Sequence, residues 1–322
     1  MGSDVVEPLT IGIDLGGTKV DMALIDAAGH ILSTNRYPTN PDKGSEGIIA
    51  DIVDAVNEFR GQAGQEVAAL GIGVAGQVDS AGVVKSAPNL PFRDEPLQTR
   101  LEKELGLPAM VMNDVNAAAY GEWRYGSGKG IDDLVVIFVG TGIGGGVVSG
   151  GQMLEGCNNT AGELGHTTLV AGGRRCHCPN LGCLEAYAGG WAIAERAQEA
   201  VSANPTEGEK LMSLAGGVEN ITAVTVSQAY RDGDPLSERL VEETGQYLAA
   251  GVVGIINAFN PCLLILAGGV IEGLPELIQI VEDVTQKRAL KSAVEKLKIV
   301  KADRGARAGV IGAAALARNK IG

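Results

Sequence analysis

Short apolar runs that end at glycine or polar residues recur along the chain and predict buried β-strands. Two such runs within residues 9–26 flank a glycine turn and predict a hairpin, and residues 67–74 and 133–139 predict further buried strands. Runs of this length bounded by turn residues are typical of strands. Other strands are predicted at residues 31–37, 109–112, 262–267 and 297–300.

Longer segments place apolar residues at helical spacing. These predicted helices span residues 47–62, 95–105, 117–123, 192–203, 226–232, 234–259, 274–289 and 306–317. The longest apolar run, residues 248–270, contains Asn260 and Pro261, where a helix should stop. It therefore predicts a buried helix followed by a buried strand, because a membrane span should be free of such interruptions.

Two predicted hairpins share one arrangement, in which a strand leads into a Gly/Thr-rich turn and a second strand follows. The first turn is Gly16-Gly17-Thr18, preceded by Asp14, and the second covers residues 140–146. Turn amides can hold a phosphate while a carboxylate holds the waters of Mg²⁺. The repetition favours a duplicated architecture that binds a nucleotide between its halves, although two unrelated tight turns would share the pattern. A dinucleotide fingerprint is excluded at residues 71–76 and 140–145 because no helix pattern follows.

A cluster of cysteines predicts a metal site. Cys176, Cys178 and Cys183 lie within eight residues of one another, and His166 lies ten residues before the first. Three thiolates and one imidazole form a closed tetrahedral set, as in structural zinc sites. A disulfide is the alternative, but no signal peptide is evident, so a reducing cytoplasm is expected.

The other cysteines and the neighbouring histidine are weaker candidates. His177 competes with His166 as a ligand but lies between two of the cysteines. Cys157 and Cys262 are expected to be buried thiols without a metal.

Polar residues beside the metal loop and at strand ends predict a site for a polar ligand. A metal would fix Glu163, His166 and Glu185 as a rigid platform. Asp114 lies at a strand-to-helix junction, where a carboxylate can act as a base or simply cap the helix. Asn89 lies in a proline-rigidified loop and could offer its amide to a hydroxyl-rich ligand or cap a turn.

Composition limits the classes of function. The 322 residues suffice for two domains, and 45% are hydrophobic, which allows a sizeable core. The net charge of −13 argues against nucleic acid as a partner, because phosphates need Lys and Arg opposite them.

Taken together, these motifs resemble the ROK family of sugar kinases and repressors, and within it the bacterial glucokinases. The segments that carry the resemblance are residues 14–18, 88–91, 113–122, 140–146, 163–166 and 176–185. The resemblance implies an α/β protein with the actin-like ATPase (ribonuclease H-like) fold. It also implies two domains around a cleft, one formed by residues 1–115 with a C-terminal helix at about 302–322 and the other by residues 116–301.

The resemblance further implies an ATP-dependent phosphorylation of the glucose 6-hydroxyl, with Asp114 as general base. It assigns the sugar site to Gly76, Asn89, Asn113, Asp114, Glu163, His166 and Glu185. It assigns ATP and Mg²⁺ to Asp14, Gly16, Gly17, Thr18, Lys19, Gly140, Thr141, Gly142, Gly268 and Gly269. Structural Zn²⁺ would be held by His166, Cys176, Cys178 and Cys183.

The alternatives concern the sugar and the class of protein. N-acetylmannosamine, fructose, mannose or allose could replace glucose, because the hydroxyl-binding residues are common to the family. A sugar-responsive repressor is disfavoured because the first hairpin begins near residue 11 and leaves no room for a DNA-binding segment. The resemblance also implies a homodimer. The cytoplasm is expected because no signal peptide is evident, and no membrane partner is expected because the longest apolar run is interrupted.

Overall fold

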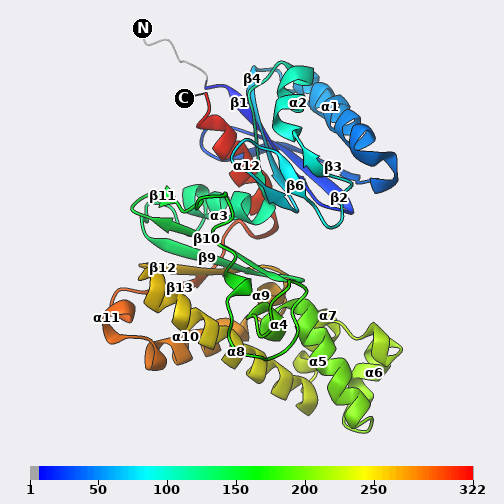
Figure 1. Cartoon of the computed structure of the whole chain (residues 1–322), viewed down its shortest axis with the longest axis vertical. Helices are drawn as coiled ribbons and strands as arrows, with labels where there is room; N and C mark the ends of the chain where they lie inside the picture. The colour runs from blue at the N-terminus through cyan, green and yellow to red at the C-terminus, as the bar shows by residue number, and fades with distance from the viewer. Residues whose placement is uncertain (1–6, 322) are drawn as a thin grey trace. The chain divides into compact units, whose positions relative to one another are not determined.

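The computed structural model describes residues 7–321, and their contacts divide the chain into two compact units (Figure 1). The first unit contains the described residues up to Gly130, residues 153–162 and the segment from Asp303 onward. The second contains residues 131–152 and 163–302. The predicted domain boundary after residue 115 and this division by contacts differ over residues 116–130 and 153–162.

A five-stranded sheet in the order β3-β2-β1-β4-β8 forms the centre of the first unit. β1 pairs antiparallel with β2, and β2 with β3, whereas β4 and β8 continue the sheet in parallel with β1. The strands are β1 (Leu9–Leu15), β2 (Lys19–Ile25), β3 (Ile31–Pro38), β4 (Val67–Val74) and β8 (Ala109–Asn113). The predicted first hairpin is therefore confirmed.

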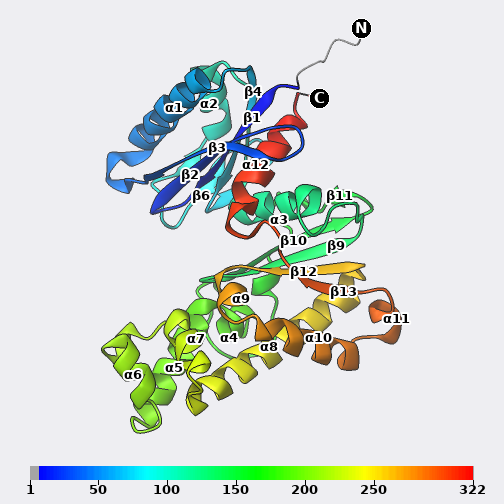
Figure 2. The same cartoon turned by 180° about the vertical axis from the view of Figure 1, so that it is seen from behind.

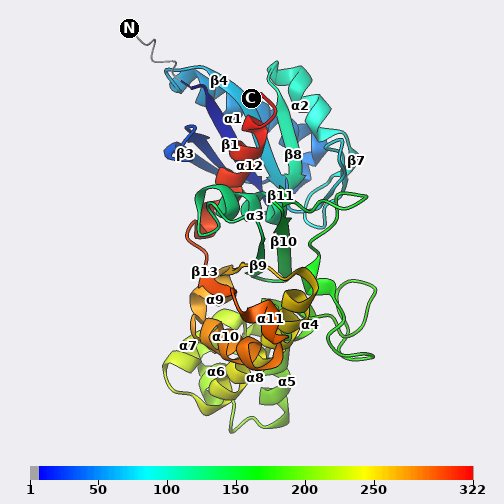
Figure 3. The same ribbon diagram turned by 90° about the vertical axis from the view of Figure 1, so that its left-hand side faces the viewer.

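Helices cover both faces of this sheet (Figures 1 and 3). The apolar sides of α1 (Gly44–Gln62) and α2 (Leu97–Leu105) pack on one face. On the other lie α3 (Asp114–Tyr125) and α12 (Ala308–Arg318). A side chain at Gly12 or Gly71 would overlap the backbone of α12, so glycine at both positions lets this helix lie directly on β1 and β4. A small sheet completes the unit, formed by β5 (Gln77–Val78), β6 (Val84–Ser86) and β7 (Arg93–Glu95).

Glu122, near the end of α3, is fully buried and fixes this helix to the segment that precedes α12. Its carboxylate accepts hydrogen bonds from the amides of Asp303, Arg304 and Gly305, at 2.6 to 3.2 Å, and from that of Ser127 at 3.2 Å. Backbone donors of this number satisfy a buried carboxylate. The helix that begins at Asp114 is thereby held firmly at its far end.

The second unit is built on a second five-stranded sheet, in the order β11-β10-β9-β12-β13. β9 pairs antiparallel with β10, and β12 and β13 continue in parallel with β9. The strands are β9 (Leu134–Val139), β10 (Ile143–Ser149), β11 (Gln152–Met153), β12 (Leu263–Ala267) and β13 (Lys298–Lys301). Both units thus place an antiparallel hairpin beside two parallel strands, which agrees with the predicted duplication.

The helices of the second unit share one large apolar core with its sheet (Figure 2). They are α4 (Glu185–Ala188), α5 (Gly190–Ala203), α6 (Glu209–Ala215), α7 (Ala223–Arg231), α8 (Pro235–Phe259), α9 (Gly269–Gly273), α10 (Glu276–Arg288) and α11 (Lys291–Val294). Short 3₁₀ turns occur in the chain at η1 (Pro41–Lys43), η2 (Leu164–His166), η3 (Val218–Asn220) and η4 (Gly305–Arg307). Within residues 7–321 no helix is long and apolar enough to cross a membrane.

Several local predictions were wrong. The helix α3 begins at Asp114 and not at residue 117, and β10 begins at Ile143, so residues 144–146 belong to a strand and not to the turn. Gly145 leaves room for the side chain of Leu164 to pack on that strand, which explains a glycine within it. Cys157 and Cys262 are exposed and not buried, because both lie in connecting segments outside the cores.

Candidate functional site

The first glycine turn, residues 16–18, joins β1 to β2 and presents free backbone amides. The amide of Gly16 donates to the carbonyl of Lys19 at 3.0 Å and closes the turn. Thr39, directly after β3, holds the carbonyls: its hydroxyl donates to Gly16 O at 2.7 Å and its amide to Thr18 O at 3.0 Å. Among the described residues, the amides of Gly17 and Thr18 have no acceptor. Free amides in such a turn can bind an anion.

The second turn, residues 140–142, joins β9 to β10 and repeats this design. The amide of Gly140 donates to Gly142 O at 2.9 Å. The first amides of α5 hold the carbonyls, with Gly190 donating to Gly140 O at 2.9 Å and Trp191 to Thr141 O at 3.0 Å. Within residues 7–321 the amides of Thr141 and Gly142 also lack an acceptor. Each unit therefore contains one turn suited to a phosphate.

The residues that support the two turns were missed by the sequence analysis. Thr39 lies 23 residues from the carbonyl that it binds, and Gly190 and Trp191 lie about fifty residues from theirs. Nothing in the local pattern of the chain marks these contacts. The Gly189-Gly190 pair at the start of α5 is a weak signal, because such pairs recur along the chain.

Asp114 is the first residue of α3, but Asn113 caps the helix. Asn113 Oδ1 accepts from the amides of Val115 and Asn116 at 2.9 and 3.0 Å. Asp114 Oδ1 accepts from Val115 N at 2.9 Å and from Asn113 Nδ2 at 3.0 Å. Oδ2 of Asp114 has no donor among the described residues, so it is available to accept a proton from a ligand.

Two partly buried carboxyl groups of the first unit influence each other. Burial, together with the nearby charge of Asp14, raises the pKa of Asp114 from its usual 3.8 to about 6. The pKa of Asp14 is also raised, first by burial and then by the charge of Asp21, although Lys19 opposes the shift. A carboxylate with a pKa near 6 is ionised at neutral pH yet basic enough to accept a proton.

The remaining residues assigned to the first unit lie around this pair. Asn113 Nδ2 also donates to the carbonyl of Gly76 at 3.0 Å. Asn89 packs directly against Gly17, where any side chain would overlap Asn89. Lys19 is half-exposed, and its Nζ lies 3.1 Å from a carboxylate oxygen of Asp21.

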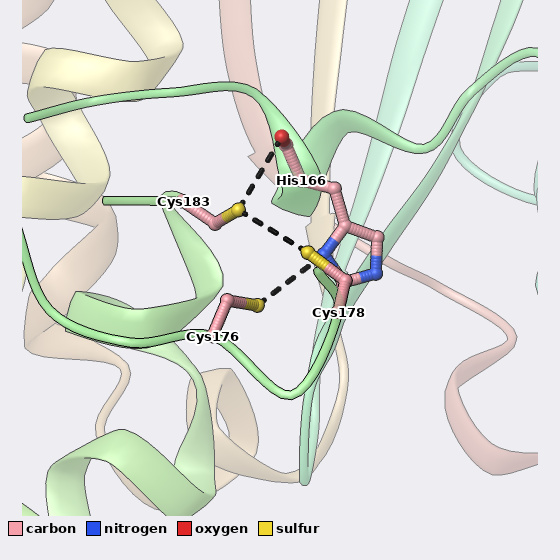
Figure 4. A group of neighbouring side chains, drawn as sticks. All are labelled: His166, Cys176, Cys178 and Cys183. Atoms are coloured by element: carbon pink, nitrogen blue, oxygen red, sulfur yellow. Dashed lines mark hydrogen bonds between the residues drawn. The ribbon is translucent and has the colours of Figure 1, made fainter. Parts of the chain in front are cut away.

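The predicted metal cluster assembles in the second unit (Figure 4). Cys178 Sγ lies 3.6 Å from Cys183 Sγ, and Cys176 Sγ lies 3.6 Å from His166 Nδ1. All four ligand atoms lie within 4.8 Å of one another. Tetrahedral zinc, with bonds of about 2.3 Å to sulfur and about 2.0 Å to nitrogen, separates neighbouring ligands by about 3.5–3.8 Å. The four residues therefore fit a zinc ion. His177 instead stacks on Trp191, with ring centroids 4.1 Å apart.

His166 presents its two nitrogens in different directions. Nδ1 points to the thiol of Cys176, whereas Nε2 lies 4.0 Å from a carboxylate oxygen of Glu163. Glu163 is more than half exposed, at 55%. A metal on Nδ1 would orient the ring and leave Nε2 beside Glu163 for another ligand.

Glu185, the first residue of α4, is buried and faces the second turn. Its Oε2 accepts from Ile143 N at 2.8 Å, and its Oε1 accepts from Trp191 Nε1 at 3.2 Å. Gly268, with φ of 95°, packs against the backbone of Val139, at the end of the strand that leads into this turn. Gly269 then begins α9. The structure thus gathers Gly140, Thr141, Gly142, Glu185 and Gly268 within the second unit.

The chain is similar to known proteins over nearly its whole length. The model of the ROK family matches residues 10–320. A glucokinase of Streptomyces coelicolor is 37% identical over 317 residues, which cover 96% of this chain and 98% of the relative. A crystal structure of a ROK family glucokinase from Streptomyces griseus, in complex with glucose and AMPPNP, is 37% identical with a TM-score of 0.80, covering 97% and 99% of the two chains. A ROK hexokinase structure from Thermus thermophilus is 32% identical with a TM-score of 0.83, covering 97% and 99%. The chain has the mixed α/β, actin-like fold of these kinases and belongs to the ROK family.

Proposed function

We propose that the protein transfers the γ-phosphoryl group of ATP to the 6-hydroxyl of glucose. The observation that carries this proposal is Asp114, a partly buried carboxylate with one unoccupied oxygen and a pKa of about 6. The resemblance over nearly the whole chain to glucokinases, one of them bound to glucose and an ATP analogue, supports the substrates.

In the proposed reaction Asp114 accepts the proton of the sugar hydroxyl. The sugar oxygen forms a bond to the γ-phosphorus while the bond to the β,γ-bridging oxygen breaks, and ADP leaves. Phosphoryl transfer of this kind depends on positioning and on neutralisation of charge. The free amides of the 16–18 and 140–142 turns would hold the phosphates, and Asp14 would hold the waters of Mg²⁺.

Six further residues are proposed to hold the sugar. They are Asn89, Asn113, Gly76 through its backbone, Glu163, His166 and Glu185. Zinc, when bound to His166, Cys176, Cys178 and Cys183, supplies a rigid loop and no chemistry of its own. Lys19 would approach the phosphates, and Gly268 and Gly269 would flank the adenosine.

We also propose that the enzyme is a cytoplasmic homodimer with two domains, residues 1–115 with 302–322 and residues 116–301. Analytical ultracentrifugation over a range of protein concentrations tests the dimer.

A coupled assay of ADP release with ATP and Mg²⁺ tests the proposed function. We expect kcat/KM for glucose to exceed that for N-acetylmannosamine by about a hundredfold, which is about 2.7 kcal/mol of transition-state preference. A preference for N-acetylmannosamine would change the substrate and retain the chemistry. If no ADP were released with either sugar, the kinase function would be contradicted.

The activity should fall in acid because the base must be ionised. With the pKa of Asp114 raised to about 6, we expect kcat/KM to rise tenfold per pH unit below that value and to level off above it. A profile measured from pH 4.5 to 8 with saturating Mg²⁺ checks this expectation. If kcat/KM instead fell only below about pH 4, the pKa of Asp114 would not be raised in the folded protein.

Thr39→Val should weaken ATP binding more than glucose binding. The substitution removes the hydroxyl that holds Gly16 O, so the 16–18 turn loses one of its two supports. A hydrogen bond of ordinary net worth predicts a rise of about threefold to tenfold in KM for ATP. Thr39→Ser keeps the hydroxyl and serves as the matched control. Equal KM values for ATP in Thr39→Val and Thr39→Ser would show that the Thr39 hydroxyl does not support ATP binding.

A further inference from the structure

Glu185 connects the metal cluster to the 140–142 turn. It follows Cys183 by two residues, and its side chain is only 8% exposed. Both carboxylate oxygens are used, Oε2 by the amide of Ile143 and Oε1 by the indole of Trp191, at 2.8 and 3.2 Å. The sulfur of Cys176, a cluster residue, lies 3.9 Å from Oε1. The carboxylate therefore lies between a cluster thiol and the backbone of the turn.

The same short segment also holds the turn from its other side. Trp191, whose indole binds Glu185, donates its backbone amide to Thr141 O, and the preceding residue Gly190 donates to Gly140 O. Gly142 leaves no room for a side chain, because a Cβ there would overlap Oε2 of Glu185. The carboxylate of Glu185 therefore packs directly against Gly142 of the turn while it binds the amide of Ile143.

We propose that Glu185 is a positioning residue for the 140–142 turn, so that an ordered metal cluster sets the affinity for the triphosphate as well as for the sugar. This inference rests on the proposed function only for the identity of the ligand. When the cluster is ordered, the segment from Cys183 to Trp191 is fixed, and Glu185 holds the amide of Ile143. The neighbouring amides of Thr141 and Gly142 then stay aligned toward a phosphate. When the cluster loosens, the turn loses this support.

The first measurement is amide hydrogen exchange in peptides that cover residues 139–145, without any ligand. We expect exchange to become at least tenfold faster in Glu185→Gln and in the wild-type protein after zinc removal. Glu238→Gln, an exposed carboxylate of α8 in the same unit, is the matched control and should leave exchange unchanged. Unchanged exchange in the zinc-free wild type would overturn the proposal, even if Glu185→Gln failed to fold.

The second measurement is calorimetric binding of β,γ-imido-ATP with Mg²⁺, without sugar. We expect Glu185→Gln to bind the nucleotide about tenfold more weakly and to retain its zinc. If the substitution merely disrupted the metal loop, zinc content and nucleotide affinity would fall together. Tight binding by zinc-loaded Glu185→Gln would also overturn the proposal. If the wild type bound no nucleotide at all, the proposed function would fail, while the exchange experiment would still decide the role of Glu185.

Discussion

Asp114→Asn is expected to lose turnover by about 10²–10⁴-fold while it retains binding of ATP and glucose. The amide has nearly the shape of the carboxylate, and its oxygen can still accept from Val115 N and Asn113 Nδ2. What it cannot do is accept the proton of an attacking hydroxyl. The measurement is kcat from ADP release, alongside glucose and nucleotide binding by calorimetry.

The same variant should be more stable than the wild type at neutral pH. The pKa of Asp114 is raised on folding, so the folded state binds the proton more tightly and loses stability as the pH rises from 3.8 to about 6. Above pH 6 the ionised carboxylate of Asp114 lowers the free energy of unfolding by its full amount, at most about 3 kcal/mol. Asp114→Asn removes it, so we expect a higher Tm at pH 7.5 and no gain at pH 3.5.

Asp54→Asn, at an exposed position on α1, is the control for both expectations. It should change neither turnover nor Tm. Near-normal turnover in Asp114→Asn would remove Asp114 from the role of base. A lower Tm in that variant at pH 7.5 would instead show that the ionised carboxylate of Asp114 is stabilised by its surroundings.

The sequence could predict those parts of the structure that depend on local pattern. The hairpin of β1 and β2 and the strand β4 follow from short apolar runs between turn residues, and the burial of these strands confirms them. The metal cluster follows from residue type and spacing, since three cysteines within eight residues leave few other uses in a reducing compartment.

Features that depend on distant contacts could not be predicted. Thr39 and Trp191 hold the two turns only because the fold brings β3 and α5 beside them. The glycines in β10 looked like part of a turn, because the packing of Leu164 on Gly145 is invisible in the sequence. The local pattern at Asp114 also fits a helix cap, and only the structure shows that Asn113 caps the helix and that Asp114 accepts hydrogen bonds at Oδ1 alone.

Cys178→Ser should abolish stoichiometric zinc binding and raise KM for glucose by at least tenfold. Ser is a poor zinc ligand, so only three ligands would remain. The loop from His166 to Glu185 would then no longer be fixed by a complete tetrahedral site. Because Nδ1 of His166 faces Cys176 while Nε2 faces Glu163, loss of the metal frees the imidazole ring to turn away from the sugar.

Cys262→Ser is a matched control, because Cys262 is an exposed cysteine of the same unit outside the cluster. It should keep one zinc per chain, measured by atomic emission, and an unchanged KM. Circular dichroism should show both variants folded, because none of the four metal ligands is part of the large apolar core of the second unit. If Cys178→Ser kept full zinc content, the ligand assignment would be wrong. If it lost zinc with KM unchanged, the metal loop would not position the sugar, and Glu163 and His166 would need another explanation.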